Sequence, residues 1–194
     1  MTHLLARATG PAVEPVTLAD AKAHLRVFNT TEDATITRMI KAAREHIEET
    51  TGRAIVTQTW KLWLDAFPRD GKITLPRPPL IGVTAIKYVD TDGAEQTLPA
   101  DVYGEYPEGF VGTVARRHGK VWPATAVDPK AVEIEFQAGY GATPSNVPSD
   151  LVSALLLLVD HFYHNRSETG DGPITVNPIA SERLLGKFKT HGWI

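Results

Sequence analysis

The sequence contains no cysteine, so neither a disulfide bond nor a catalytic thiolate is available to it. It also lacks a long apolar run. The longest uninterrupted one spans residues 154–159, whereas a membrane-spanning helix needs about 20 apolar residues. Residues 1–15 show neither the apolar core nor the small-residue cleavage pattern of a signal peptide. We therefore expect a soluble protein that remains where it is made and does not bind a membrane.

The sequence also lacks a large excess of positive or negative charge. The chain has 20 Lys and Arg residues against 23 Asp and Glu residues, a net charge of −3, and its cations are spread along the sequence. A DNA-binding module would show a basic stripe and a strongly salt-dependent affinity, so this function is disfavoured. At 194 residues, with 42% hydrophobic residues, the chain is long enough for a domain with its own core and an inserted module.

Helical periodicity is confined to the two ends of the sequence. Thr17 is placed to cap a short helix, and Thr31 to cap a longer one that Gly52 ends. The longer helix carries an apolar stripe, and its Arg44 and Glu48 form an i, i+4 ion pair that we expect on the solvent face. Helix returns after Ser149, a predicted N-cap, and again in a short segment near the C-terminus.

The middle of the sequence follows the two-residue period of β-strands. Residues 54–67 and 131–141 alternate apolar and polar side chains, and Asp92-Gly93 marks a hairpin turn. Ten of the 14 prolines lie between residues 68 and 148, which is typical of strands and loops. We predict an α+β fold in which residues 15–53 and 148–194 form a helical bundle. Residues 54–147 form an inserted, antiparallel β-rich module.

The helix that begins near residue 149 is apolar on every side. A surface helix of a soluble protein normally has a single apolar stripe, and the other helices of the bundle are too few to surround this one. We expect neighbouring subunits to complete its covering, with the β-rich module as the alternative. The residues assigned to subunit packing are Leu151, Leu155, Leu156, Leu158, Val159 and Phe162.

Five phrases of the sequence, in this order and at this spacing, resemble one family. They are "PVTLADAKAHLRV", "AAREHIEETTGRA", "LPRPPLIGVTAIKYVD", "FQAGYG" and "LLLLVDHFYHNR". Together they resemble the head-tail connector proteins of tailed phages, also called adaptor or head-completion proteins, which have relatives in prophages and gene transfer agents. The resemblance covers residues 15–166 and is weakest after residue 170.

The resemblance implies a structural protein, not an enzyme, and no cofactor. It implies a homo-oligomeric ring, commonly of twelve copies, that docks beneath the portal protein of a virion or phage-like particle after assembly in the bacterial cytoplasm. The ring would extend the DNA channel at the head–tail junction, let DNA pass without specific binding, and contact a tail-side stopper or tail terminator protein.

Two groups of polar residues offer other interpretations. Asp160, His161 and His164 resemble a metal site, and a small metal-dependent enzyme using them is the alternative function. Their spacing differs from the HExxH motif and no further ligand is evident, so we predict no catalytic, cofactor-binding or metal-binding residue. The basic segment 116–120 is interpreted as a solvated hairpin loop, with contact to DNA phosphate or to an acidic partner as the alternative.

The C-terminus combines apolar residues with cations. We hypothesise that it is loose in the monomer and orders on docking to the portal ring. The alternative is that it folds back on its own bundle. The residues assigned to portal docking are Leu184, Leu185, Phe188, Trp193 and Ile194.

Overall fold

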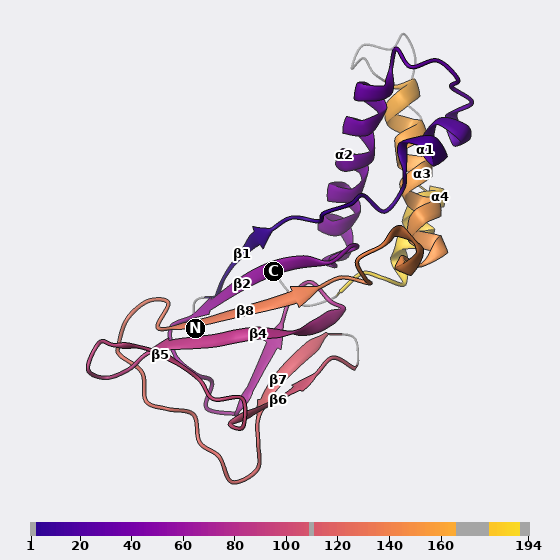
Figure 1. The fold of residues 1–194 in the computed structure, drawn as a ribbon. Helices are drawn as coiled ribbons and strands as arrows, with labels where there is room; N and C mark the ends of the chain where they lie inside the picture. The colour runs from indigo at the N-terminus through magenta and orange to yellow at the C-terminus, as the bar shows by residue number, and fades with distance from the viewer. Residues whose placement is uncertain (1–2, 109–110, 166–178, 191–194) are drawn as a thin grey trace. The chain divides into compact units, whose positions relative to one another are not determined.

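The computed structural model describes residues 3–108, 111–165 and 179–190 (Figure 1). The chain divides into two compact units. The β unit comprises Met1–Ala12 and Thr57–Tyr140, and the helical unit comprises Val13–Val56 and Gly141–Ile194. Helices from both halves of the sequence pack together, and antiparallel sheets lie between them in sequence, which confirms the predicted α+β class. Among the described residues, no helix has the length and apolar character needed to cross a membrane.

The helical unit begins with two helices whose ends follow the sequence signals. In α1 (Leu18–Leu25), the Thr17 hydroxyl accepts a hydrogen bond from the Asp20 amide at 3.1 Å. Helix α2 (Asp33–Thr51) ends at Gly52, whose φ of 70° lets its amide bond back to Glu48 O at 3.0 Å. The predicted cap Thr31 is wrong, because Glu32 occupies the N-cap position and makes no capping hydrogen bond.

The second half of the helical unit contains η1 (Pro144–Asn146), α3 (Ser149–His164) and α4 (Ile179–Gly186). Pro148, not Ser149, is the N-cap of α3. Helix α3 packs against α1, α2 and α4. Among the residues that the structure describes, the core that they enclose is aliphatic. Its buried members include Ala21, Leu25, Ile36, Ile40, Ala43, Ile47, Leu151, Ala154, Leu155, Val159 and Leu185.

The β unit holds a five-stranded sheet and a three-stranded sheet. The first has the order β1-β2-β8-β4-β5 and the second the order β3-β7-β6. The strands of the first are β1 (His3–Thr9), β2 (Gln58–Leu64), β4 (Leu80–Val89), β5 (Glu95–Thr97) and β8 (Val132–Ala138). Those of the second are β3 (Lys72–Leu75), β6 (Tyr103–Tyr106) and β7 (Gly112–Arg116).

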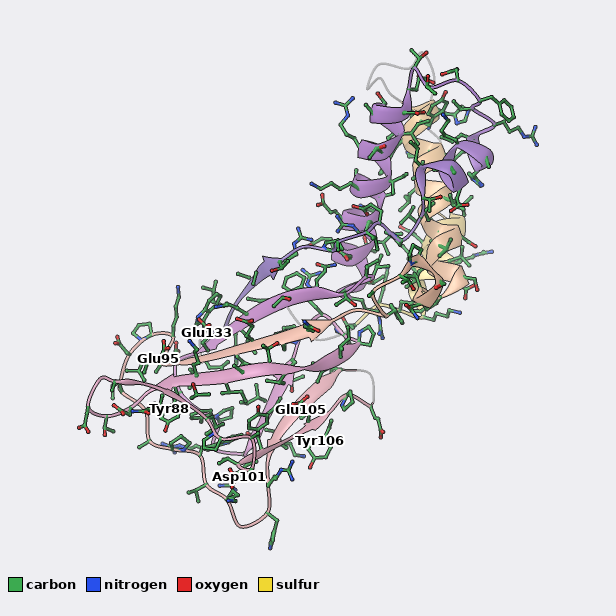
Figure 2. The ribbon with its side chains drawn as sticks, viewed as in Figure 1. Tyr88, Glu95, Asp101, Glu105, Tyr106 and Glu133 are labelled. Carbon is green, nitrogen blue, oxygen red and sulfur yellow. The ribbon has the colours of Figure 1, made fainter. Side chains whose placement is uncertain are left out.

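Strands β2 and β8 form the centre of the five-stranded sheet. They pair antiparallel without a register shift from Gln58↔Ala138 to Leu64↔Val132. Both strands alternate buried and half-buried residues over most of their length, as the two-residue period predicts. The Glu105 carboxylate on β6 accepts a hydrogen bond from the Val83 amide on β4 at 3.0 Å, and this contact links the two sheets (Figure 2).

Strand β1 is an element that the sequence analysis missed. It pairs antiparallel with β2, from His3↔Leu64 onward, and forms one edge of the sheet. All but one of its residues are exposed, so its side chains do not alternate between a buried and a solvated face. The inserted β-rich part of the fold therefore also includes residues from the start of the chain.

Candidate assembly surfaces

Helix α3 is covered by its own chain on one side only. Leu151, Leu155 and Val159 are at most 1% exposed within a single copy of the protein. Within one copy, α1, α2 and α4 enclose these three side chains, and their predicted part in subunit packing stays a prediction. Leu156, Leu158 and Phe162 are only half-buried, and Leu157 is 38% exposed. Together with the half-buried Val152, these residues are the apolar part of the helix that remains accessible.

The polar end of α3 is held by contacts within the helix and by one contact to the N-cap residue of α2. His164 Nδ1 lies 3.3 Å from the Asp160 carboxylate, and His161 Nδ1 lies 3.2 Å from the amide nitrogen of Asn165. The Tyr163 hydroxyl donates a hydrogen bond to the Glu32 carboxylate. Across the ranges that the structure describes, no three His, Cys, Asp or Glu side chains are placed to hold a metal ion. These contacts are those of a capped helix end.

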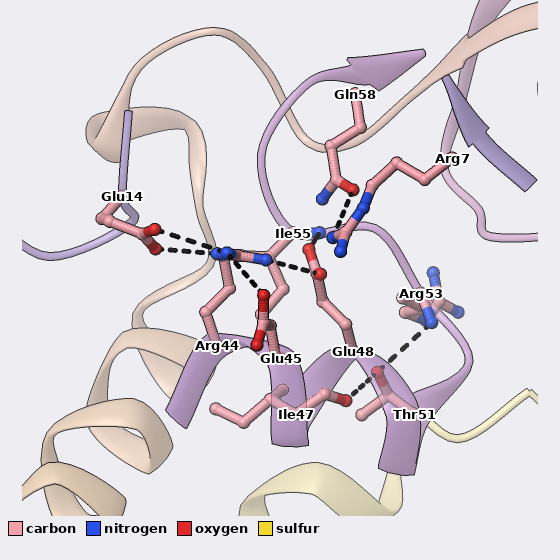
Figure 3. A network of polar contacts seen from close by, with 10 residues as sticks. All are labelled: Arg7, Glu14, Arg44, Glu45, Ile47, Glu48, Thr51, Arg53, Ile55 and Gln58. Atoms are coloured by element: carbon pink, nitrogen blue, oxygen red, sulfur yellow. Dashed lines mark hydrogen bonds and ion pairs between the residues drawn. The ribbon is translucent and has the colours of Figure 1, made fainter. Parts of the chain in front are cut away.

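A network around a buried arginine links α2 to the segment before α1 and to the segment after α2 (Figure 3). Arg44 is 2% exposed; its Nε donates to Glu14 at 2.7 Å and its Nη1 donates to Glu48 at 2.9 Å. The second oxygen of Glu48 accepts the Ile55 amide at 3.1 Å. Burial disfavours the charged guanidinium, but the hydrogen bond and the nearby carboxylates outweigh it and raise the pKa of Arg44. The expected solvent-face position of Arg44 is therefore wrong.

The outer face of the five-stranded sheet carries a ladder of paired charges. Lys61 lies 2.7 Å from Glu133 and 3.4 Å from Glu135, and the Trp63 indole donates to Glu133 at 2.8 Å. Burial acts against ionisation of Glu133, yet the hydrogen bonds from Lys61 and Trp63 keep its pKa below the usual value. On β5, Glu95 pairs with Lys87 at 2.9 Å (Figure 2). On this face, both lysines are paired with carboxylates.

One end of this sheet borders an apolar groove, which we call the β1–β2 groove. Its volume is about 680 Å³. Its lining residues are Leu4, Trp63, Asp65, Ala66, Thr125, Ala126, Val127, Asp128, Pro129 and Lys130. Leu4 is 44% exposed and Val127 is fully exposed. The Lys130 ammonium lies 5.5 Å from the centre of the Trp63 ring, close enough for a cation–π contact.

The basic segment 116–120 makes contacts within the β unit. Arg117 Nε donates to Tyr103 O at 2.6 Å, and Lys120 pairs with Asp101 at 2.6 Å. The Arg116 amide donates to Gly71 O at 2.9 Å. The two side-chain contacts neutralise or fix part of the local charge, as in a solvated hairpin.

The C-terminal segment folds back on its own helical unit over residues 179–190. Leu185 is 2% exposed, Leu184 and Phe188 are half-buried, and the Thr190 amide donates to Thr51 O at 2.8 Å. Arg53 also donates to Phe188 O at 2.7 Å. The expectation of a loose tail is therefore wrong for these residues. Trp193 and Ile194 lie outside the described residues.

Comparison with known families identifies the kind of protein to which these surfaces belong. A family model described as "Head completion protein" matches residues 15–173. The chain belongs to the head completion protein family. Its members are structural proteins, so the alternative of a metal-dependent enzyme using Asp160, His161 and His164 is wrong.

Solved structures similar to this head completion protein come from gene transfer agent (GTA) particles. The neck of an empty GTA particle, computed with C6 symmetry, matches with a TM-score of 0.82 and 28% sequence identity. The virion of a native GTA particle matches at 0.80 and 27%, and a native GTA neck computed with C12 symmetry at 0.80 and 26%. Each match covers 98% of this chain and 97% of the other. No curated protein matches the chain.

Proposed function

We propose that this head completion protein is a head–tail adaptor in the neck of a phage or phage-like particle. Copies of the chain form a closed ring beneath the portal, extend the DNA channel and join a tail-side stopper or tail terminator protein. The observation that carries the proposal is the similarity over nearly the whole chain to proteins of GTA necks, one of them computed with C12 symmetry. Twelve copies are the number that this symmetry favours.

The charge distribution supports a channel that lets DNA pass. The chain has a net charge of −3, and cations such as Lys61, Lys87 and Lys120 are paired with carboxylates. A surface without a basic stripe attracts few phosphates, so DNA does not bind tightly as it moves. The role is therefore geometric: the ring positions other components and catalyses no reaction.

The accessible side of α3 is the proposed packing surface between subunits. Its apolar residues are the half-buried Leu156, Leu158 and Phe162 and the exposed Leu157. Leu151, Leu155 and Val159 support the surface from inside. Replacing Leu156 with Asp is expected to lower incorporation into particles at least 10-fold, because the carboxylate would lose its water at the subunit contact. Unchanged incorporation of Leu156→Asp would contradict this assignment.

Portal docking is assigned to the C-terminal residues. Trp193 and Ile194 are the proposed anchors, with Leu184 and Phe188 beside them, whereas Leu185 belongs to the core of the helical unit. Removing residues 191–194 leaves α4 intact, so the truncated chain is expected to fold but not to join heads. A truncated chain that joins heads in normal amounts would exclude docking through these four residues.

The experiment that tests the adaptor function removes the gene and inspects the particles by electron microscopy. The expected result is DNA-filled heads without tails, or heads that leak DNA, with tailed particles restored by the wild-type gene. Complementation by the His161→Ala/His164→Ala variant serves as a control and should restore them equally well. Normal tailed particles in the absence of the gene would refute the proposal.

A further inference from the structure

We propose that Phe28 of one copy inserts into the β1–β2 groove of the next copy, with Arg26 facing Asp128 at the rim. This inference rests on the proposed ring, because it describes a contact between neighbouring copies. It joins two features of the chain that the fold itself leaves unexplained. One is a protruding aromatic residue on the helical unit, and the other is an open apolar groove on the β unit.

Phe28 protrudes from a loop that is fixed on both sides. Its side chain is 90% exposed, which is unusual for so large an apolar residue. Before it, the Val27 amide donates to Lys22 O at 3.0 Å; after it, Asn29 Oδ1 accepts the Thr31 amide at 3.1 Å. A salt bridge of 2.6 Å between Lys22 and Asp33 closes the loop from its two helices.

An aromatic side chain on a fixed loop is well suited to bind a partner. Little backbone entropy is lost on binding when the loop that carries the side chain is already held in place. Aromatic residues that fill a pocket at the centre of an interface commonly dominate its binding energy. The rigid loop of residues 26–31 therefore presents Phe28 as an anchor.

The β1–β2 groove has the properties of the matching pocket. Trp63 forms its aromatic wall, and the indole is oriented by its hydrogen bond of 2.8 Å to Glu133. Leu4 and the fully exposed Val127 add apolar surface that a single copy leaves in contact with water. A volume of about 680 Å³ is more than sufficient for one phenyl ring.

Charged residues at the rim of the groove favour Phe28 and its neighbour Arg26 over a purely apolar occupant. Arg26 is exposed two residues before Phe28, and Asp128 is exposed directly after Val127. An insertion of Phe28 near Val127 brings a cation on one copy toward an anion on the other. Such complementarity at the rim of an interface mainly sets orientation and specificity.

The two patches differ, so the contact between them is heterologous. Each copy would give its Phe28 to one neighbour and receive Phe28 from the other neighbour. Repetition of such a contact produces a closed ring when the rotation between copies closes. The proposed geometry is thus of the type that a cyclic assembly requires.

The absence of cysteine in the natural chain permits a clean crosslinking test. The double variant Phe28→Cys/Val127→Cys is assembled into particles and oxidised under mild conditions. Crosslinked chains longer than dimers are expected, because each copy can bond to two neighbours. Particles assembled from a mixture of the two single variants should give dimers only, and each single variant alone should give none.

Three results would overturn the inference. The first is particles that contain the double variant in normal amounts but no crosslinked chains. The second is dimers formed by the Phe28→Cys variant alone, which would show that two Phe28 side chains meet. The third is a crosslink from position 127 to a different neck protein, which would assign the groove to that protein.

Charge-reversal variants test the inference if the double-cysteine variant does not enter particles. Arg26→Glu and Asp128→Lys should each weaken the subunit contact, and their combination should restore incorporation to within about 2-fold of wild type. Arg38→Glu, which changes an exposed cation on α2, is the matched control and should have no effect. Failure of the combined variant to recover incorporation contradicts the Arg26–Asp128 pairing. If the wild-type chain is itself absent from particle necks, the adaptor function fails, whatever the crosslinking shows.

Discussion

Replacing Arg44 with alanine tests the ion pairs that link Arg44 to Glu14 and Glu48 inside the helical unit. In the wild type, the guanidinium bridges Glu14 and Glu48, at 2.7 Å and 2.9 Å. The Glu14 side chain is 29% exposed and can regain water when the arginine is lost. Glu48 is 5% exposed, so its carboxylate would stay buried after losing the 2.9 Å contact with Arg44, while it keeps the hydrogen bond from the Ile55 amide.

The expected cost follows from this difference. Removing one partner of a buried ion pair destabilises a protein by about 3–5 kcal/mol, because the other charge stays buried without compensation. We expect Arg44→Ala to lower the free energy of unfolding by an amount in this range. The double variant Arg44→Leu/Glu48→Leu should cost less than Arg44→Ala, since it removes the buried charge together with its partner.

Urea unfolding at neutral pH measures this effect. Far-ultraviolet circular dichroism follows the helices, whereas fluorescence mainly follows the β unit, which holds Trp60, Trp63 and Trp122. Arg44→Ala should shift the dichroism transition to lower urea, and the fluorescence transition should shift less if the two units unfold separately.

The double variant is the matched control for this reasoning. If Arg44→Ala changes the free energy of unfolding by less than about 0.5 kcal/mol, the network is not a source of stability. If the double variant is less stable than Arg44→Ala, the penalty does not come from a stranded Glu48 charge. Either result would refute the argument.

Two further predictions concern the β unit. A Cβ atom at Gly112 would lie 2.4 Å from the Leu80 side chain, so Gly112→Ala should cost about 1–3 kcal/mol in thermal or urea unfolding, whereas Gly10→Ala, with open space around it, should be nearly neutral. A cost for Gly10→Ala equal to that for Gly112→Ala would contradict this account. The pKa of Glu133 is lowered from 4.5, so its contribution to stability is present above that pH and is lost as the pH falls through the folded-state value. Glu133→Gln should therefore destabilise the protein at neutral pH and flatten the loss of stability in acid, and an unchanged acid dependence in unfolding curves would exclude this role.

Regular periodicity made much of the fold predictable from the sequence. The apolar stripe of α2 predicted one buried face, and Ile36, Ile40 and Ile47 of that stripe are buried. The two-residue alternation of β2 and β8 likewise predicted strands, because each has one face in the core. These signals depend on local sequence, so they can be recognised without knowledge of the tertiary packing.

The features that escaped prediction depend on tertiary context. Strand β1 lies at a sheet edge with most of its residues exposed, so no alternation marks it. Arg44 was expected in water because a charge on a helix usually is, but carboxylates from two segments surround it. The β1–β2 groove combines Leu4, Trp63 and residues 125–130, which only the folded sheet brings together.

The function was predicted from the family resemblance, because periodicity alone does not indicate it. An apolar helix suggested contact with other subunits, yet the chain itself encloses Leu151, Leu155 and Val159. The inference of a neck protein therefore does not depend on that helix being uncovered. It depends on the family match over residues 15–173 and on the similar GTA neck structures.

A side-chain-resolution electron microscopy map of the particle neck tests the adaptor function most directly. We predict that the map shows copies of this chain in one closed ring between the portal and the tail, around the DNA channel. A neck that is complete without this chain, or that holds it as isolated copies outside the channel, would contradict the account.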